Sequence, residues 1–127
     1  MIKEYEFQAL GEENNYQQFP DEIETNNHIL FHGTAEVNFE NIKKQGFQPK
    51  ADGKLSSISF AKKSSLALSY ACAARNNLSP KGIIIMVDIS NIKQECIVDQ
   101  NFGIHLSPKF QPKIIGYCLV PENYKFK

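Results

Sequence analysis

Apolar residues recur at two different spacings along the chain, and these spacings predict the order of its elements. Residues 83–87, Ile-Ile-Ile-Met-Val, are the most apolar run, and a short β-branched run without alternation predicts a strand covered on both faces. Gly116 indicates a bulge or a close backbone approach within a later strand. Further strands are predicted at residues 28–31, 57–60, 96–98, 104–106 and 114–120.

Helical spacing is found twice, both times early in the chain. In residues 37–45 charged side chains surround Phe39 and Ile42, and Gly46 stands where a helix commonly ends with a left-handed residue. Residues 63–74 form one apolar stripe at helical period, made of Leu66, Ala67, Tyr70, Ala71 and Ala74. The order β-α-β-α followed by several strands predicts an α+β fold, and the length predicts a single domain over residues 1–127.

The charge balance limits the classes of partner. The 127 residues contain 14 basic and 14 acidic side chains, so no net field favours nucleic acid or an anionic membrane. Arg75 is the one arginine, which argues against a mechanism that needs several bidentate phosphate clamps.

The cysteines and the N-terminal residues indicate the compartment. Cys72, Cys96 and Cys118 are odd in number and widely spaced, which is typical of free thiols in a reducing compartment. The N-terminal residues lack a signal-peptide pattern, and no apolar run approaches the ~18 residues of a membrane span. We therefore expect a cytoplasmic protein without a membrane partner.

Residues 29–34, Ile-Leu-Phe-His-Gly-Thr, carry the chemistry that organises the prediction, and we expect the strand to end in a His-Gly-Thr turn. The imidazole of His32 can bond a ligand hydroxyl. Gly33 has no Cβ, so its N–H and C=O can approach a flat ligand and pair with a carboxamide. Tyr70 could stack on the ligand ring or pack in the core, and the sequence leaves both interpretations open.

An ordered set of short segments resembles the NAD-binding half of the ADP-ribosyltransferase fold, in its poly(ADP-ribose) polymerase-like, diphtheria-toxin-type branch. The segments are Phe31-His32-Gly33-Thr34, Asn38-Phe39, Ile42, Gly46-Phe47, Ser57-Ile58-Ser59-Phe60-Ala61, Ser69-Tyr70-Ala71 and the strand from Ile83 to Asp88. The resemblance spans about residues 29–90 and implies a split β-sheet core with two early helices.

The resemblance also implies a substrate and a reaction. NAD would be bound through the His32-Gly33-Thr34 segment, with His32 on a ribose hydroxyl and Gly33 on the nicotinamide carboxamide. Tyr70 would stack on the nicotinamide. The bond between nicotinamide and ribose would break through an oxocarbenium-like transition state, as in glycoside hydrolysis, and ADP-ribose would pass to an acceptor.

Two departures from the family pattern concern catalysis. Ser59 stands where the branch has a tyrosine of its catalytic triad, so the pocket wall and the cofactor contact differ there. No glutamate lies between Glu95 and Glu122, where the catalytic Glu is expected. His105 is the candidate that occupies this place, and Asp99 is the alternative; the sequence does not decide between them.

Three functions remain open on the sequence. The first is a small, effector-like mono-ADP-ribosyltransferase whose loops 48–56 and 99–113 read a macromolecular acceptor, a protein rather than a nucleic acid. The second is a catalytically inactive relative that acts as a binding or inhibitory module. The third is an NAD glycohydrolase of the same fold. RNA 2′-phosphotransferases also have a His-Gly-Thr turn, but they need several arginines, which argues against that family here. No metal site is predicted.

Overall fold

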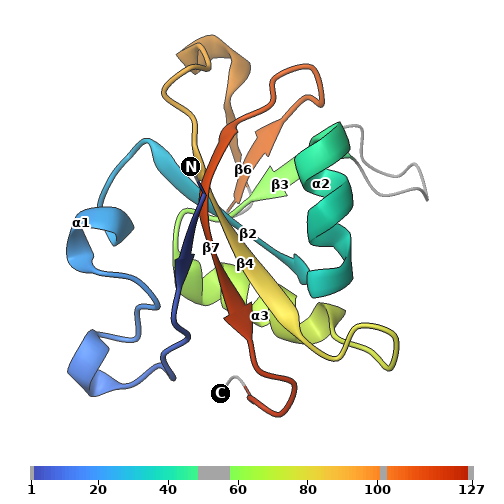
Figure 1. Cartoon of the computed structure of the whole chain (residues 1–127). Coiled ribbons are helices and arrows are strands. Elements are labelled where there is room, and N and C mark those ends of the chain that lie inside the picture. Colours follow the sequence, from blue (N-terminus) through green and yellow to red (C-terminus); the bar gives the residue numbers. More distant parts are fainter. Residues whose placement is uncertain (1, 49–57, 101–102, 126–127) are drawn as a thin grey trace.

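The computed structural model describes residues 2–48, 58–100 and 103–125, whose strands form two sheets (Figure 1). The strands are β1 (Lys3–Tyr5), β2 (Ile29–Ala35), β3 (Ile58–Phe60), β4 (Gly82–Asp88), β5 (Val98–Gln100), β6 (Gly103–Leu106) and β7 (Lys113–Val120). The α-helices are α1 (Asp21–Glu24), α2 (Phe39–Gln45) and α3 (Ser64–Ala74). Three 3-10 turns are η1 (Glu12–Asn14), η2 (Glu36–Asn38) and η3 (Gln94–Cys96).

The two sheets meet at one point along β2. The larger sheet has the order β1-β7-β4-β2 and the smaller has the order β3-β6-β5. Strand β1 runs parallel to β7, and the other strand pairs are antiparallel. Phe31 and Ala61 exchange two backbone hydrogen bonds, of 2.9 and 2.7 Å, across the junction. This split sheet with helices α2 and α3 confirms the predicted α+β fold.

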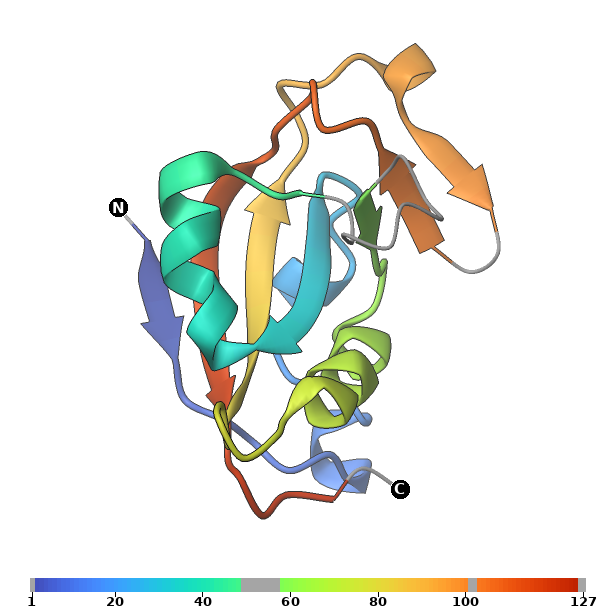
Figure 2. The ribbon, with the colours of Figure 1, turned by 90° about the vertical axis from the view of Figure 1, so that its right-hand side faces the viewer.

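Strand β4 lies at the centre of the core, as its composition predicts. Its residues from Gly82 to Val87 are all buried. Ile83, Ile85 and Val87 pack in one cluster with Phe39 of α2, whereas Ile84 and Met86 pack in a second cluster with residues of α3. Successive side chains of a strand point to opposite faces, so α2 and α3 cover opposite faces of the sheet. In the view of Figure 1, α3 lies behind the strands, and Figure 2 shows it from the side.

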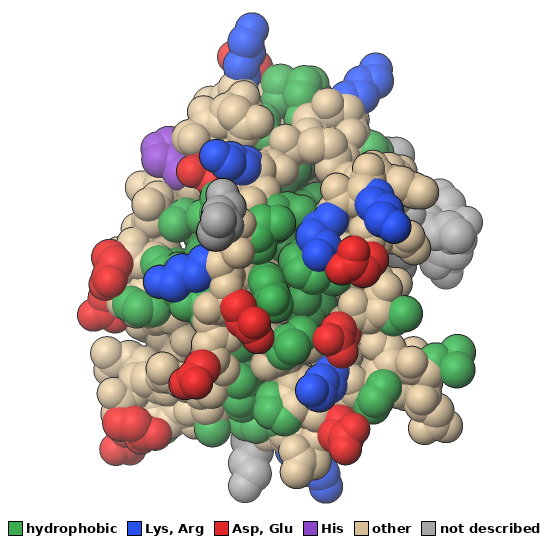
Figure 3. All heavy atoms as spheres, in the orientation of Figure 1, with side chains coloured by type: hydrophobic (Ala, Val, Ile, Leu, Met, Phe, Trp, Pro, Cys, Tyr) green, Lys and Arg blue, Asp and Glu red, His purple; other side chains and the backbone are tan. Residues whose placement is uncertain are grey.

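The face seen in Figure 1 has a mixed surface. Figure 3 shows hydrophobic side chains along its middle, with basic and acidic side chains interspersed around them. Neither sign of charge dominates this face, in agreement with the formal net charge of zero. Among the described helices none has the length and apolar character needed to cross a membrane.

The predicted His-Gly-Thr turn is wrong, because β2 continues through it to Ala35. Every residue from Ile29 to Ala35 has a partner on β4, and His32 lies opposite Ile85. The seven-residue pairing therefore outweighs the local turn preference of Gly and Thr. The chain turns only at η2, so helix α2 begins at Phe39 instead of residue 37.

The apolar stripe predicted on α3 is displaced. The buried residues are Ser64, Ala67, Leu68 and Ala71, whereas the side chain of Tyr70 is 54% exposed. Ala67 and Ala71 lie against β2 where Gly33 has no side chain, and a Cβ on Gly33 would lie only 1.9 Å from the Ala67 carbonyl oxygen. Close approach of small residues thus fixes the buried face.

Predictions for the other glycines are confirmed. Gly46 ends α2 with a φ of 82°, and the pairing of β4 with β7 shifts register beside Gly116, as a bulge requires. A Cβ on Gly116 would also lie 2.9 Å from the Tyr5 ring. The strand predicted at residues 96–98 is displaced, because Cys96 is the last residue of η3 and β5 begins at Val98. Most of the predicted recognition loop 48–56, with Ser57, lies outside the described residues.

Candidate functional site

His32 lies half-buried on β2 beside the junction of the two sheets. Its ring packs on Phe47 and Phe60, with centroid distances of 5.1 and 5.5 Å. Its Nδ1 lies 3.0 Å from the backbone oxygen of Ser59. A carbonyl oxygen can only accept, so Nδ1 carries the hydrogen and donates it. The lone pair on Nε2 is then the ring's acceptor.

The environment keeps this imidazole neutral. Burial lowers the pKa of His32 because it disfavours the charged ring, and the hydrogen bond to the Ser59 carbonyl acts in the opposite direction. At neutral pH the ring is therefore uncharged. A neutral Nε2 can accept a hydrogen bond from a ligand hydroxyl, such as that of a ribose.

Ser59 joins two of the predicted residues. Its carbonyl accepts from His32, and its Oγ lies 3.0 Å from Nδ1 of His105. Strands β3 and β6 pair so that Ser59 stands directly opposite His105, which puts both side chains on the same face. The structure thus brings the three predicted catalytic residues, His32, Ser59 and His105, into one connected group.

The alternative carboxylate, Asp99, points elsewhere. Its register partner on β6 is Ile104, whereas that of Val98 is His105. Neighbouring positions on a strand face opposite sides, so Asp99 lies across the sheet from the Ser59–His105 pair. Asp99 also forms an ion pair with Lys62, in which both side chains are about half exposed. Of the two candidates for the missing glutamate, His105 is the one beside Ser59.

Gly33 directs its backbone groups to the outer edge of β2. The N–H of Glu36 donates to Lys81, and that of Ile89 donates to the carbonyl of His28, so the even-numbered residues of β2 bond toward β4. Phe31 bonds instead to Ala61 on the other side. Residues two apart along a strand point their backbone groups the same way, so the N–H and C=O of Gly33 face this outer edge. A carboxamide could pair with both groups.

The two remaining predicted residues flank this edge differently. Thr34 accepts a hydrogen bond from the Asn38 amide at 2.9 Å, so its hydroxyl already supports the start of η2 and α2. Tyr70 extends from α3 with about half of its surface exposed, which leaves its ring accessible to a flat ligand. The core-packing interpretation of Tyr70 is wrong.

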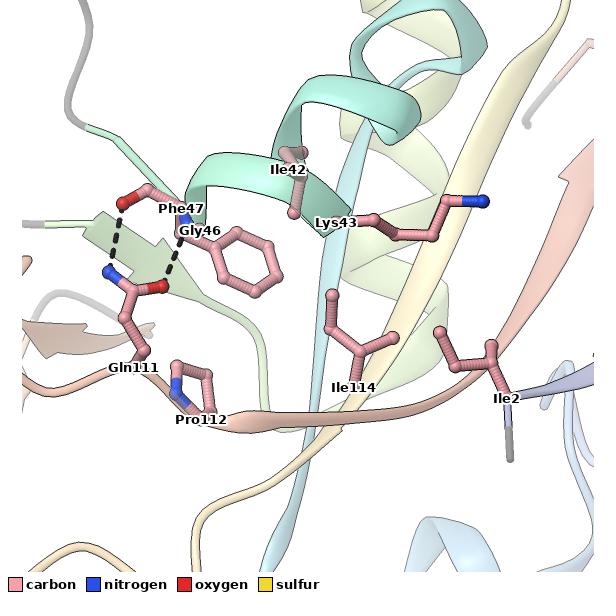
Figure 4. Close-up of a pocket in the computed structure, with 8 residues that line it drawn as sticks. All are labelled: Ile2, Ile42, Lys43, Gly46, Phe47, Gln111, Pro112 and Ile114. Carbon is pink, nitrogen blue, oxygen red and sulfur yellow. Dashed lines mark hydrogen bonds between the residues drawn. The ribbon is translucent and has the colours of Figure 1, made fainter.

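The sequence did not reveal how His32 is supported. Phe47 contacts the His32 ring, and a glutamine side chain holds the backbone of Phe47. Gln111 accepts from the Phe47 N–H at 2.7 Å and donates to its carbonyl at 3.0 Å (Figure 4). The side-chain amide of Gln111 therefore pairs with the backbone of Phe47 as a neighbouring strand would. In the sequence, the only indication of this pairing is a polar residue between Phe110 and Pro112.

One hollow in the described surface is a groove of about 310 Å³. Figure 4 shows the residues that line it: Ile2, Ile42, Lys43, Gly46, Phe47, Gln111, Pro112 and Ile114. Phe47 separates this groove from His32, which is not among the lining residues. Within residues 2–48, 58–100 and 103–125, no three His, Cys, Asp or Glu side chains gather as metal ligands.

One family model matches the chain. The model of the Poly(ADP-ribose) polymerase catalytic domain matches residues 2–109, which include β1 to β6 and every candidate site residue. No curated protein matches the chain.

Proposed function

Because the chain belongs to the poly(ADP-ribose) polymerase catalytic-domain family, we propose that it is a small mono-ADP-ribosyltransferase that uses NAD as its substrate. The observation that supports this most directly is the fixed, neutral imidazole of His32 beside the outward backbone edge of Gly33. One group accepts from a hydroxyl, and the other pairs with a carboxamide. NAD carries both groups on adjoining rings.

In this proposal each residue has a binding role. His32 accepts a hydrogen bond from a ribose hydroxyl through Nε2. Gly33 donates its N–H to the carboxamide oxygen and accepts from the carboxamide nitrogen. Tyr70 stacks on the nicotinamide from the α3 side. Held in this way, the bond between nicotinamide and ribose breaks as positive charge develops on the sugar.

The transfer step distinguishes this chain from its family pattern. With Ser59 and His105 in place of the tyrosine and the carboxylate, His105 is the base that takes the proton from the acceptor. Lengthening a polymer would require activation of a ribose hydroxyl by the missing carboxylate, which favours single transfers. The zero formal charge and the mixed surface of Figure 3 favour a protein acceptor over a nucleic acid.

The second candidate, an inactive binding module, is favoured by the packing around His32. Phe47 and Phe60 lie against the ring, and His32 does not line the described groove. Such a module would associate with a protein partner through other surfaces, and binding would survive loss of the imidazole.

Incubation with labelled NAD distinguishes these functions. We expect the wild-type chain to release nicotinamide and label a protein, and His32→Ala to lose this activity by about 100-fold because the ribose is misplaced. The matched control is His28→Ala, which removes an exposed histidine four residues earlier. Free ADP-ribose without label on protein would indicate a glycohydrolase. Intact NAD, or equal activity in His32→Ala, would overturn the proposal.

A further inference from the structure

The side-chain amide of Gln111 holds the backbone of Phe47 at both its donor and its acceptor end. Oε1 accepts from the Phe47 N–H at 2.7 Å, and Nε2 donates to the Phe47 carbonyl at 3.0 Å (Figure 4). Nε2 also donates to the carbonyl of Pro108 at 2.7 Å, within the loop that precedes β7. These bonds use both N–H groups of the amide. Gln111 therefore joins this loop to the segment directly after α2.

The same amide lies closely against Gly46, the residue that ends α2. A Cβ on Gly46 would lie only 2.7 Å from Oε1 of Gln111, and Gly46 has a φ of 82°. Phe47 is the next residue, and its side chain is only 2% exposed. The turn at Gly46 and the clamp by Gln111 together fix the backbone from which the Phe47 ring extends.

The ring of Phe47 is one of three aromatic rings that contact one another. Its centroid lies 5.1 Å from that of His32 and 5.1 Å from that of Phe60, with the planes nearly perpendicular in both pairs. The His32 and Phe60 rings lie 5.5 Å apart. A change in the backbone position of Phe47 would therefore move a ring that covers one side of the imidazole.

The contacts of the imidazole have separate roles. The carbonyl of Ser59 holds one ring atom, Nδ1, while Phe47 and Phe60 limit how the plane of the ring can turn. Together they determine the direction of the Nε2 lone pair. These three contacts carry no charge, so the pKa of His32, which burial lowers, depends on how tightly they enclose the ring.

We propose that Gln111 is a positioning residue for His32, and that it acts through Phe47 and not on the substrate. Its effect on the reaction rests on the proposed function, in which Nε2 of His32 orients a ribose hydroxyl. Gln111 lies beyond residues 2–109, which the family model matches, so family membership assigns it no role.

The first measurement is an NMR titration of the His32 ring in the purified full chain. Gln111→Met keeps a side chain of similar length but removes all three hydrogen bonds. We expect Phe47 to loosen and water to reach the imidazole, so the pKa of His32 should rise toward its ordinary value of 6.5. Gln45→Met is the matched control, because it removes an exposed glutamine at the end of α2.

The control should keep the wild-type pKa of His32. An equal pKa in Gln111→Met and the wild type would overturn the proposal, even if the variant were less stable, because a merely structural role changes stability alone. Gln111→Asn keeps the amide on a side chain that is one methylene shorter. It should cause a smaller rise in the pKa, and it serves the same test if Gln111→Met does not fold.

A double-mutant cycle tests whether Gln111 acts through Phe47. Phe47→Leu keeps an apolar side chain but removes the ring, so it should also raise the pKa of His32. Adding Gln111→Met to Phe47→Leu should raise the pKa no further, because the ring through which the amide acts is already absent. Additive effects of the two substitutions would overturn the route through Phe47.

Nicotinamide release from NAD measures the consequence for the reaction. We expect kcat of Gln111→Met to fall by about 10-fold with a smaller change in KM, because a misdirected imidazole orients the ribose poorly in the transition state. Unchanged release in this variant would overturn the role of Gln111 in the reaction, and the proposed function would still be decided by His32→Ala. Absence of release by the wild type would overturn the proposed function, and the titration would then decide the positioning of His32 by itself.

Discussion

The imidazole of His32 and the absent side chain of Gly33 face opposite sides of β2. His32 points toward Phe47 and Phe60, whereas a Cβ on Gly33 would point into the backbone of α3. Two adjacent residues therefore meet unrelated demands, which are ligand chemistry in the proposed function on one face and close helix packing on the other. The dipeptide His-Gly is informative because both demands fall on one short segment.

The burial of His32 predicts a pH dependence of stability. Its pKa is lowered from 6.5 in the folded chain, so below about pH 6.5 the unfolded chain binds more protons than the folded one. The free energy of unfolding should therefore fall as the pH is lowered from 6.5 toward the folded pKa, and be independent of this group above that range. Urea denaturation of the wild type and His32→Gln at several pH values measures it.

In that pH range the free energy of unfolding of His32→Gln should change less steeply with pH than that of the wild type. The difference in slope corresponds to about one bound proton at most. His28→Gln, at an exposed position, is the matched control and should keep the wild-type slope. Identical slopes for all three chains would show that His32 is not protected from protonation.

At the scale of elements, the strongest sequence patterns predicted local structure well. The run at residues 83–87 lies in the buried strand β4, and the pairing of β4 with β7 shifts register beside Gly116, which also approaches the Tyr5 ring closely. Patterns whose outcome depends on contacts with another element of the fold were less informative. The buried face of α3 is set by Gly33 beneath Ala67, and helical period alone cannot weigh such a contact.

The candidate residues of the site could be named from the sequence, but the contacts between them could not. His32, Ser59 and His105 follow from the order of motifs and from the place where a glutamate is missing. The register that sets Ser59 opposite His105 joins residues 46 positions apart, and no local pattern encodes it. The clamp of Gln111 on Phe47 is equally remote, because the two residues are 64 positions apart.

The contact of α3 with β2 gives a sharp mutational test. Gly33→Ala would place a methyl group 1.9 Å from the Ala67 carbonyl oxygen, which cannot rotate away. We expect a loss of about 3 kcal/mol in the free energy of unfolding, because the helix must move off the strand. Urea denaturation measures this loss.

Gly11→Ala is the matched control. The nearest atoms to its new methyl group are the carboxylate oxygens of Glu13, at 2.7 and 2.8 Å, and that side chain can swing aside. Gly11 has an extended φ of −166°, so alanine is not strained there. Similar losses at both positions would contradict the packing of α3 directly on Gly33.

At the scale of the whole molecule, the reactivity of the buried Cys118 can be used to measure how often the fold opens. Cys118 lies on β7 between β1 and β4, fully buried, and burial raises the pKa of its thiol to about 12. Thiol reagents attack the thiolate, so native Cys118 should react only when the sheet opens. We expect it to react at least ~100-fold more slowly than the partly exposed Cys96.

The measurement is the labelling rate of each cysteine by mass spectrometry, in native buffer and in urea. A chain carrying Cys72→Ser and Cys96→Ser isolates Cys118, and urea should release its full reactivity. Native labelling of Cys118 at the rate of Cys96 would mean that β7 is not held between its neighbours.

The position of β7 between β1 and β4 has a consequence for biosynthesis. Lys3 pairs with Gly116, so β1 must wait during synthesis for a strand that is made much later. Until residues 113–120 emerge, the nascent chain has no strand to bridge β1 and β4, and the larger sheet remains open. Such long-range pairing slows folding. Any catalytic activity that requires the closed sheet therefore has to wait until β7 has paired with both β1 and β4.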